Sequence, residues 1–252
     1  MSAPPSYSKL PAPHYLQSPR VCCITLNEGD KLRLIGVPNE LVPHVRAGII
    51  RSWGKIQREQ NYSGAHEFKM SGNPWWGYGD DHVPARRLIV EVVRTMARQG
   101  WNLVQSADVS KKENDKDSLF FETVDPNSIV GADLMQVDMF SVSFGSRDKL
   151  RVIDPPSLDV VAVVRQAINT QWRSGISREE ESKGVAMFKL NGYPWYPQAE
   201  ETVYSRMMLS QLLANLRALG YKLYTSVDIS AGGSESQDTE TWIFRRVGNA
   251  WS

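Results

Sequence analysis

The feature that most constrains this sequence is an internal repeat. The segment FKMSGNPW at residues 68–75 returns as FKLNGYPW at residues 188–195, an offset of 120 positions. With the same offset, LVQSADVS at residues 103–110 returns as LYTSVDIS at residues 223–230. Because a fixed offset between separate segments is the signature of duplication, we interpret the chain as two copies of one folding unit. Four further pairs recur in the same order: DKLR at residues 30–33 and 148–151, Trp53 and Trp172, Arg86 and Arg206, and Gly100 and Gly220.

The repeat divides the chain into four segments. Residues 21–124 form the first repeat and residues 138–247 form the second. Residues 125–137 form a linker, and because it is short we expect the two units to dock against each other. Residues 1–20 are Pro-rich, contain few aliphatic residues and show no periodicity, so we expect them to be a disordered tail.

Hydrophobic periodicity predicts the elements of each repeat. Apolar residues at alternate positions, as in Cys22, Ile24 and Leu26, predict a β-hairpin at the start of the repeat. Apolar residues at helical spacing predict two helices, which end near Trp53 and before Gly100. A short strand is expected between the helices, and a pair of strands after them. We therefore predict an α+β fold in which each repeat is a two-layer sandwich of order ββαβαββ, with the helices on one face of the sheet.

Composition and charge limit the kinds of partner and compartment. The chain is 41% hydrophobic, and its formal net charge of +1 argues against a nucleic-acid partner. No apolar run approaches the roughly 20 residues that cross a bilayer, so no membrane span or signal peptide is expected. Cys22 and Cys23 are adjacent and form no disulfide framework or zinc pattern, which is typical of a reducing compartment. We therefore expect a cytoplasmic protein, with the nucleus as the alternative.

The N-terminal tail contains a short candidate binding motif, Pro4-Pro5-Ser6-Tyr7. It resembles the PPxY ligand of WW domains, whose aromatic grooves bind a polyproline II segment and the tyrosine that follows it. The resemblance implies WW-domain partners, among them WW-bearing ubiquitin ligases, with Pro4, Pro5 and Tyr7 as the contacting residues. The alternative is that a Pro-rich segment matches the motif by chance.

The side of each sheet that faces away from the helices is a second candidate site. If Phe68 and Met70 point into the core, Lys69 points outward because side chains alternate along a strand. Basic residues on this side could bind an anion such as a phospholipid headgroup or a nucleic-acid phosphate. The alternative, which we favour, is a solvated face whose charges pair locally. The candidate anion-binding residues are Lys31, Arg33 and Lys69 in the first repeat and Lys149, Arg151 and Lys189 in the second.

Each repeat also places aromatic residues in the turn that follows a Gly-x-Pro sequence. The first repeat has Trp75 and Trp76 there, and the second has Trp195 followed by Tyr196. Exposed aromatic residues on a rigid turn can anchor a partner protein, so Trp75, Trp76 and Trp195 are candidate partner-binding residues. A Trp beside a tight Pro turn can instead fold back onto the core, which we expect more often.

The sequence offers little for catalysis, for a metal or for another cofactor. The second repeat has no histidine, and the chain has no His-Glu-x-x-His helix, Gly-x-Ser-x-Gly elbow or phosphate-binding Gly-rich loop. Asp108, Asp115 and Asp117 could bind a cation, but they flank a loop whose length differs between the repeats, and we interpret them as loop-capping residues. Cys23 would need a neighbouring base to act as a nucleophile. We therefore predict no catalytic residue, no metal and no cofactor.

These observations favour a non-catalytic intracellular adaptor. In this hypothesis the tail binds a WW-domain protein and the duplicated body binds another protein partner. If the equivalent surfaces of both repeats bind at once, the overall affinity for that partner increases. One alternative is an anion-binding module that uses the basic sheet faces and loses affinity as the salt concentration rises. A second alternative is an enzyme whose site lies in the cleft between the two repeats.

Overall fold

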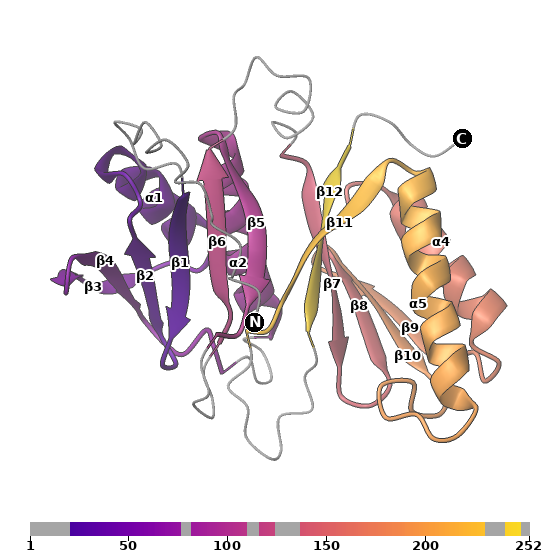
Figure 1. The fold of residues 1–252 in the computed structure, drawn as a ribbon. Coiled ribbons are helices and arrows are strands. Elements are labelled where there is room, and N and C mark those ends of the chain that lie inside the picture. The colour runs from indigo at the N-terminus through magenta and orange to yellow at the C-terminus, as the bar shows by residue number, and fades with distance from the viewer. Residues whose placement is uncertain (1–20, 77–81, 110–115, 124–136, 230–239, 248–252) are drawn as a thin grey trace, which may run out of the picture.

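A computed structural model describes residues 21–76, 82–109, 116–123, 137–229 and 240–247 (Figure 1). Within these residues each repeat folds into six strands and two α-helices. The first repeat contains β1 (Val21–Asn27), β2 (Lys31–Ile35), α1 (Val42–Ser52), β3 (Ile56–Tyr62), β4 (Ala65–Met70), α2 (His82–Arg98), β5 (Trp101–Ala107) and β6 (Ser118–Thr123). The second contains β7 (Met139–Gly145), β8 (Lys149–Ile153), α4 (Leu158–Gln171), β9 (Ile176–Ser182), β10 (Val185–Leu190), α5 (Glu201–Ala218), β11 (Tyr221–Val227) and β12 (Thr241–Arg246).

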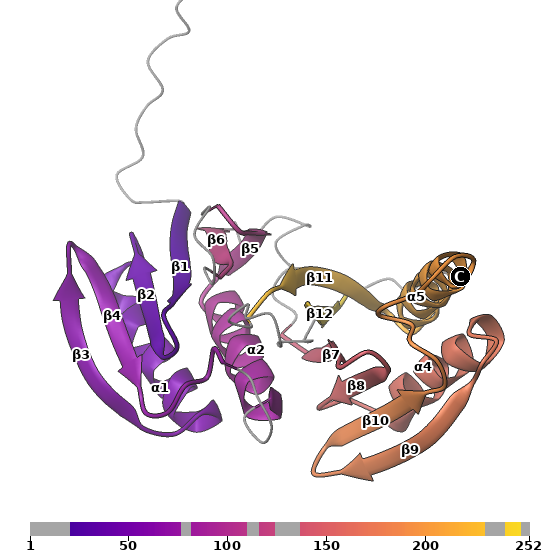
Figure 2. The same ribbon diagram turned by 90° about the horizontal axis from the view of Figure 1, so that it is seen from below.

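The two sheets have the same topology. The strand order is β3-β4-β2-β1-β6-β5 in the first repeat and β9-β10-β8-β7-β12-β11 in the second, and every neighbouring pair is antiparallel. The helices of each repeat lie on one face of its own sheet (Figure 2). The predicted tandem duplication of an α+β unit is therefore confirmed.

Each repeat contains one strand more than the sequence predicted. The predicted order ββαβαββ lacks β3 and its counterpart β9, which lie at the edge of each sheet. Their sequences, IQREQNY and ISREEES, contain no buried residue. An edge strand that buries little on either side lacks the apolar alternation that identifies a half-buried strand. The observed order is therefore ββαββαββ.

Tryptophan hydrogen bonds explain what the repeated FKxxGxPW motif does in the fold. Trp75 donates its indole N–H to the carbonyl oxygen of Lys31 at 2.8 Å, and Trp195 makes the same bond to Lys149 at 2.8 Å. A buried indole N–H requires an acceptor, so each bond fixes the Gly-x-Pro turn to the first hairpin of its repeat. Equivalent bonds of 2.8 Å join a second tryptophan of each repeat to the same turn: Trp53 to the carbonyl of Ser71, and Trp172 to that of Asn191.

The two repeats stack as four layers, in the order sheet, helices, sheet and helices (Figure 2). Helix α2 lies between the two sheets, and α4 and α5 lie on the far side of the second sheet. All seven residues of β7 are buried, because helices cover both of its sides. Met139 and Ile243, which project from the second sheet towards α2, belong to the hydrophobic core of the first repeat. The two repeats are therefore docked through a shared apolar core.

A tyrosine from the second repeat completes the backbone hydrogen bonding of β5. The register of β5 against β6 shifts between Leu103 and Gln105, which marks a β-bulge. The Leu103 N–H donates to the hydroxyl oxygen of Tyr224 on β11 at 2.6 Å, and that hydroxyl donates to Asn102 Oδ1 at 2.7 Å. The second repeat thus supplies the hydrogen bond that the bulge removes from the ladder of the first.

We predict that Tyr224→Phe lowers the free energy of unfolding by about 1–3 kcal/mol, because it leaves the Leu103 N–H without its acceptor at a half-buried site. Urea unfolding followed by circular dichroism measures this change. The matched control is Tyr62→Phe, which removes the hydroxyl of a tyrosine that is 47% exposed and is expected to change stability by less than about 0.5 kcal/mol. Equal losses in the two variants would show that the Tyr224 hydroxyl does not hold the repeats together.

Candidate functional site

The outer face of the first sheet is the side that faces away from α1 and α2, and none of the described helices or strands covers it (Figure 2). Its apolar residues lie on β1, on the end of β2 and on the two strands that follow α2. Val21 is 59% exposed, Ile35 is 45% exposed and Val104 is 53% exposed. Cys23 and Phe120, a pair on neighbouring strands, are partly exposed beside them. This apolar half of the face is a candidate surface for a protein partner.

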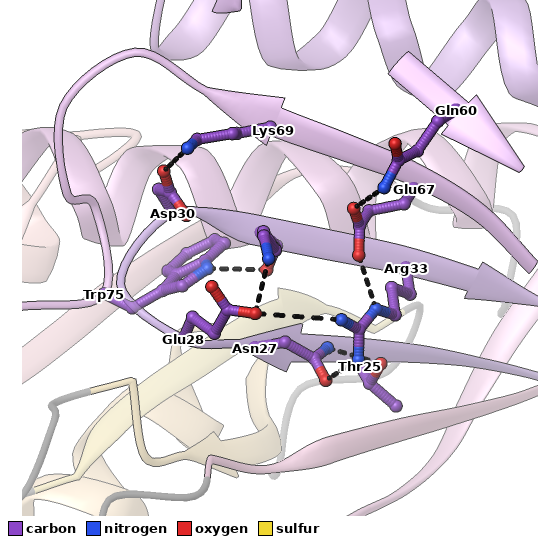
Figure 3. Close-up of polar contacts among 10 residues, drawn as sticks. Thr25, Asn27, Glu28, Asp30, Arg33, Gln60, Glu67, Lys69 and Trp75 are labelled. Carbon is purple, nitrogen blue, oxygen red and sulfur yellow. Dashed lines mark hydrogen bonds and ion pairs between the residues drawn. The ribbon is translucent and has the colours of Figure 1, made fainter. Parts of the chain in front are cut away.

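The other half of the outer face is a polar network centred on Arg33 (Figure 3). Arg33 donates from Nε to Glu67 at 2.7 Å and from Nη1 to Asn27 at 2.8 Å. Gln60 donates to the second carboxylate oxygen of Glu67 at 2.7 Å. Burial alone would raise the pKa of Glu67, but the hydrogen bonds from Arg33 and Gln60 outweigh it and hold the pKa below its usual value. The network therefore carries a compensated pair of charges.

Most of the basic residues predicted to bind an anion are paired with carboxylates nearby. In the first repeat Lys31 pairs with Glu28, and Lys69 pairs with Asp30 at 3.5 Å (Figure 3). In the second repeat Lys189 pairs with Asp148 at 3.8 Å, whereas Lys149 is partly exposed. These pairs favour the interpretation of a face whose charges are satisfied locally.

Arg151 corrects the expectation that both sheets present equivalent open faces. Its Nη1 lies 3.2 Å from Nε2 of His82, the first residue of α2, so it lies beneath the helix. The Nε2 atom of His82 also lies 3.2 Å from the hydroxyl of Ser143 on β7. The equivalent face of the second repeat is therefore occupied by a helix of the same chain.

The structure separates the three candidate tryptophans of the turns. Trp75 is fully buried, so its assignment as a partner-binding residue is wrong and its role is to close the core. Trp195 is partly buried and packs against the core of the second repeat. Trp76 is 49% exposed and is the most exposed of the three.

The second repeat has an exposed cluster that the sequence analysis did not single out. Arg147 lies near the rings of Tyr193 and Tyr196, with guanidinium-to-centroid distances of 5.9 and 5.1 Å.

The cleft between the repeats is lined by charges that pair with one another. A cavity of about 390 Å³ lies between α1, α2 and the strands β7 and β8. In its wall Arg87 binds the carboxylate of Asp154 through two hydrogen bonds of 2.8 and 2.7 Å. Glu91 pairs with Arg51 and with Arg94, the latter at 2.6 Å. Arg94 also donates to the carbonyl oxygen of Met139 at 2.8 Å. The contacts of Arg87 with Asp154 and of Arg94 with Met139 join the two repeats across the cleft, whereas Glu91 pairs within the first repeat. These paired charges give no positive support to a catalytic site there.

The remaining chemical candidates serve the fold in the part of the chain that the structure describes. Burial raises the pKa of Cys23 to about 11, so its thiol stays protonated near neutral pH and is a weak nucleophile. Asp117 accepts hydrogen bonds from the hydroxyl of Ser106 at 2.8 Å and from the N–H of Asp228 at 2.9 Å. Burial raises the pKa of Asp117 despite these bonds. Four of the predicted residues lie outside the described part of the chain: Asp115, Pro4, Pro5 and Tyr7. Within the described part, no group of three His, Cys, Asp or Glu side chains could hold a metal.

We predict that Glu91 makes the stability of the protein depend on acid pH. Burial would raise the pKa of Glu91, but hydrogen bonds and charge interactions from Arg51 and Arg94 lower it below the ordinary value of 4.5. A carboxylate whose pKa is lowered by folding stabilises the protein above its unfolded pKa, and this contribution is lost as the pH falls through the folded pKa.

The substitution Glu91→Gln tests this assignment, and α5 already carries Gln211 at the equivalent position. Urea unfolding should show that the variant is less stable than the wild type at neutral pH. The difference should shrink as the pH is lowered below 4.5, where the wild-type carboxylate also becomes neutral. A stability difference that stays constant with pH would assign the effect to packing instead of charge.

Comparison with known proteins supports the duplication. A protein-family model of a single domain matches the chain twice, at residues 20–122 and 138–245, and the chain therefore belongs to that domain family. Each match spans the six strands of one sheet. No curated protein and no solved structure matches the sequence. None of the described helices is both long and apolar enough to span a membrane.

Proposed function

We propose that this protein is a non-catalytic adaptor with two binding sites. The first is the tail, in which Pro4, Pro5 and Tyr7 bind a WW-domain protein. The second is the outer face of the first sheet, which binds a protein partner. The two sites are separate segments of one chain, so a single molecule would bring two proteins together.

The observation that carries this proposal is the use of the same face in the second repeat. There the outer face of the sheet binds α2, with Met139, Ile153 and Ile243 at most 2% exposed. The offset of 118 that relates Asp30 to Asp148 places Val21 and Ile35 of the first repeat at the positions of Met139 and Ile153. This sheet surface therefore binds a helix in one repeat, and in the other no described element covers it.

The chemistry of the open face suits a protein partner better than an anion. The apolar half offers Val21 and Ile35, whose burial contributes favourable free energy in proportion to the area covered. In the polar half, Arg33 and Lys69 are already paired with Glu67 and Asp30. An anion would have to displace these carboxylates, whereas an apolar partner surface would leave them in place.

The tail is assigned from its chemistry alone, because it lies outside the described residues. Two consecutive prolines favour the extended polyproline II conformation that WW grooves bind, and the tyrosine provides an aromatic ring and a hydroxyl at the next contact position. WW-bearing ubiquitin ligases are members of the partner class that this motif implies.

We predict that the full chain binds a purified WW domain from a ubiquitin ligase and that Tyr7→Ala weakens this binding by roughly tenfold or more, which corresponds to about 1.4 kcal/mol. Fluorescence anisotropy with a labelled WW domain measures the affinity. Tyr15→Ala is the matched control, because Tyr15 lies in the same tail outside the motif and should leave the affinity unchanged. Equal affinities for the wild type and both variants would remove the tail from the proposal.

A further inference from the structure

Helix α5 occupies the place in the second repeat that α2 occupies in the first. The offset of 120 places Met207 and Ser210 of α5 at the positions of Arg87 and Val90 of α2. In α2 these residues face the second sheet, where Arg87 binds Asp154 and Val90 is 5% exposed. In α5 both counterparts are exposed, because α5 lies at the end of the stack (Figure 2).

The exposed side of α5 is a shallow groove lined by apolar and polar residues, with Arg206 among them. Val203 is 57% exposed and Met207 is 47% exposed, which is unusual for large apolar side chains on one side of a helix. The groove has lost charges that α2 carries, since Gln211 stands at the position of Glu91. The residues of α5 that line it include Thr202, Val203, Arg206, Met207, Ser210 and Gln211.

The outer face of the first sheet is the matching surface at the other end of the stack, where no described helix or strand lies on it. The residues that α2 covers on the second sheet are Met139, Ile153 and Ile243, at 2%, 1% and 0% exposure. Strand register places Val21, Ile35 and Phe120 at the same sites of the first sheet. All three are apolar, so the first sheet keeps the chemistry of a helix-binding face.

Charges at the edge of these surfaces are complementary between molecules. Within the chain, Arg245 of β12 donates to Asn102 Oδ1 of β5 at 3.1 Å across the interface between the repeats. Strand register places Glu122 at the position of Arg245, and the offset of 120 places Lys222 at the position of Asn102. Both Glu122 and Lys222 are exposed. When the internal contact is repeated between two molecules, the carboxylate of Glu122 in one molecule therefore faces the ammonium group of Lys222 in the other.

We propose that the outer face of the first sheet binds a second molecule of this chain through its α5 and β11, in the same way that the second sheet binds α2 within one molecule. The inference rests on the proposed function in that it names the protein that occupies the outer face. Such a contact joins different surfaces of the two molecules, so it closes into a ring if the rotation allows and otherwise extends as a chain.

The contact between molecules is weaker than the contact within one. The ion pair of Arg87 with Asp154 has no counterpart, because Met207 and Gly36 stand at those positions. Association of two molecules also costs free energy because translational and rotational freedom is lost, whereas the two repeats of one chain are already linked. Association is therefore reversible and depends on protein concentration.

Sedimentation velocity of the full chain over a wide concentration range tests the inference. We expect wild-type protein to show reversible, concentration-dependent association. Glu122→Lys and Lys222→Glu should each weaken it by about tenfold or more, because each places like charges in contact. The double variant should recover the wild-type association to within about threefold, because the charges are opposite again. Met207→Asp should abolish association, because it places a carboxylate in the apolar contact.

Glu40→Lys is the control, since Glu40 is exposed in the turn before α1, away from both surfaces. It should associate as the wild type does. Circular dichroism of each variant identifies any that fails to fold, and the double variant separates charge complementarity from general damage. A wild-type chain that stays monomeric, or a double variant no better than the single ones, overturns the inference. The binding of the WW domain is measured on the same samples, so its persistence in a monomeric chain leaves the tail half of the adaptor intact.

Discussion

The burial of α2 on both of its sides is the constraint on which the rest of the structure depends. Leu88 and Val92 are fully buried, while Val90, on another side of the helix, is 5% exposed and lines the cleft with Ile153. Separating the repeats would expose Val90 together with Met139 and Ile243, which the second sheet contributes to this core, at a cost of about 25 cal/mol for each Å². The two family domains therefore share one apolar core, although each has the strands and helices of a complete unit.

Much of this fold could be predicted because the chain contains the same pattern twice. The alternation of Cys22, Ile24 and Leu26, all at most 4% exposed, indicated a half-buried strand, and its counterpart in the second repeat supported the same assignment. The edge strands β3 and β9 could not be found in this way. Their residues alternate in no apolar pattern, and only pairing with β4 and β10 defines them as strands. Backbone pairing at a sheet edge leaves little trace in side-chain chemistry.

The candidate site was harder to predict, because periodicity gives the side to which a residue points and not what covers that side. Val21 and Met139 stand at equivalent positions, yet Val21 is 59% exposed and Met139 is 2% exposed. The difference arises from the order of the layers, since among the described elements helices lie on both sides of the second sheet and on one side of the first. A trace of this asymmetry does exist in the sequence. At equivalent positions α2 carries Arg87 and α5 carries Met207. The two helices have therefore diverged on the side that faces away from their own sheets.

The polar network around Arg33 limits where a partner can bind on the open face. Arg33 pairs with Glu67, and its guanidinium lies 4.1 Å from the centroid of the Tyr62 ring. These side chains occupy the part of the face that lies towards β3. The exposed aliphatic residues of this face, Val21, Ile35 and Val104, lie on β1, β2 and β5, outside this network. Any assembly built through this half of the face would carry one tail for each molecule. If these tails bind WW domains as proposed, several of them held in one particle would bind more strongly than a single tail, because each further contact forms at a high effective concentration.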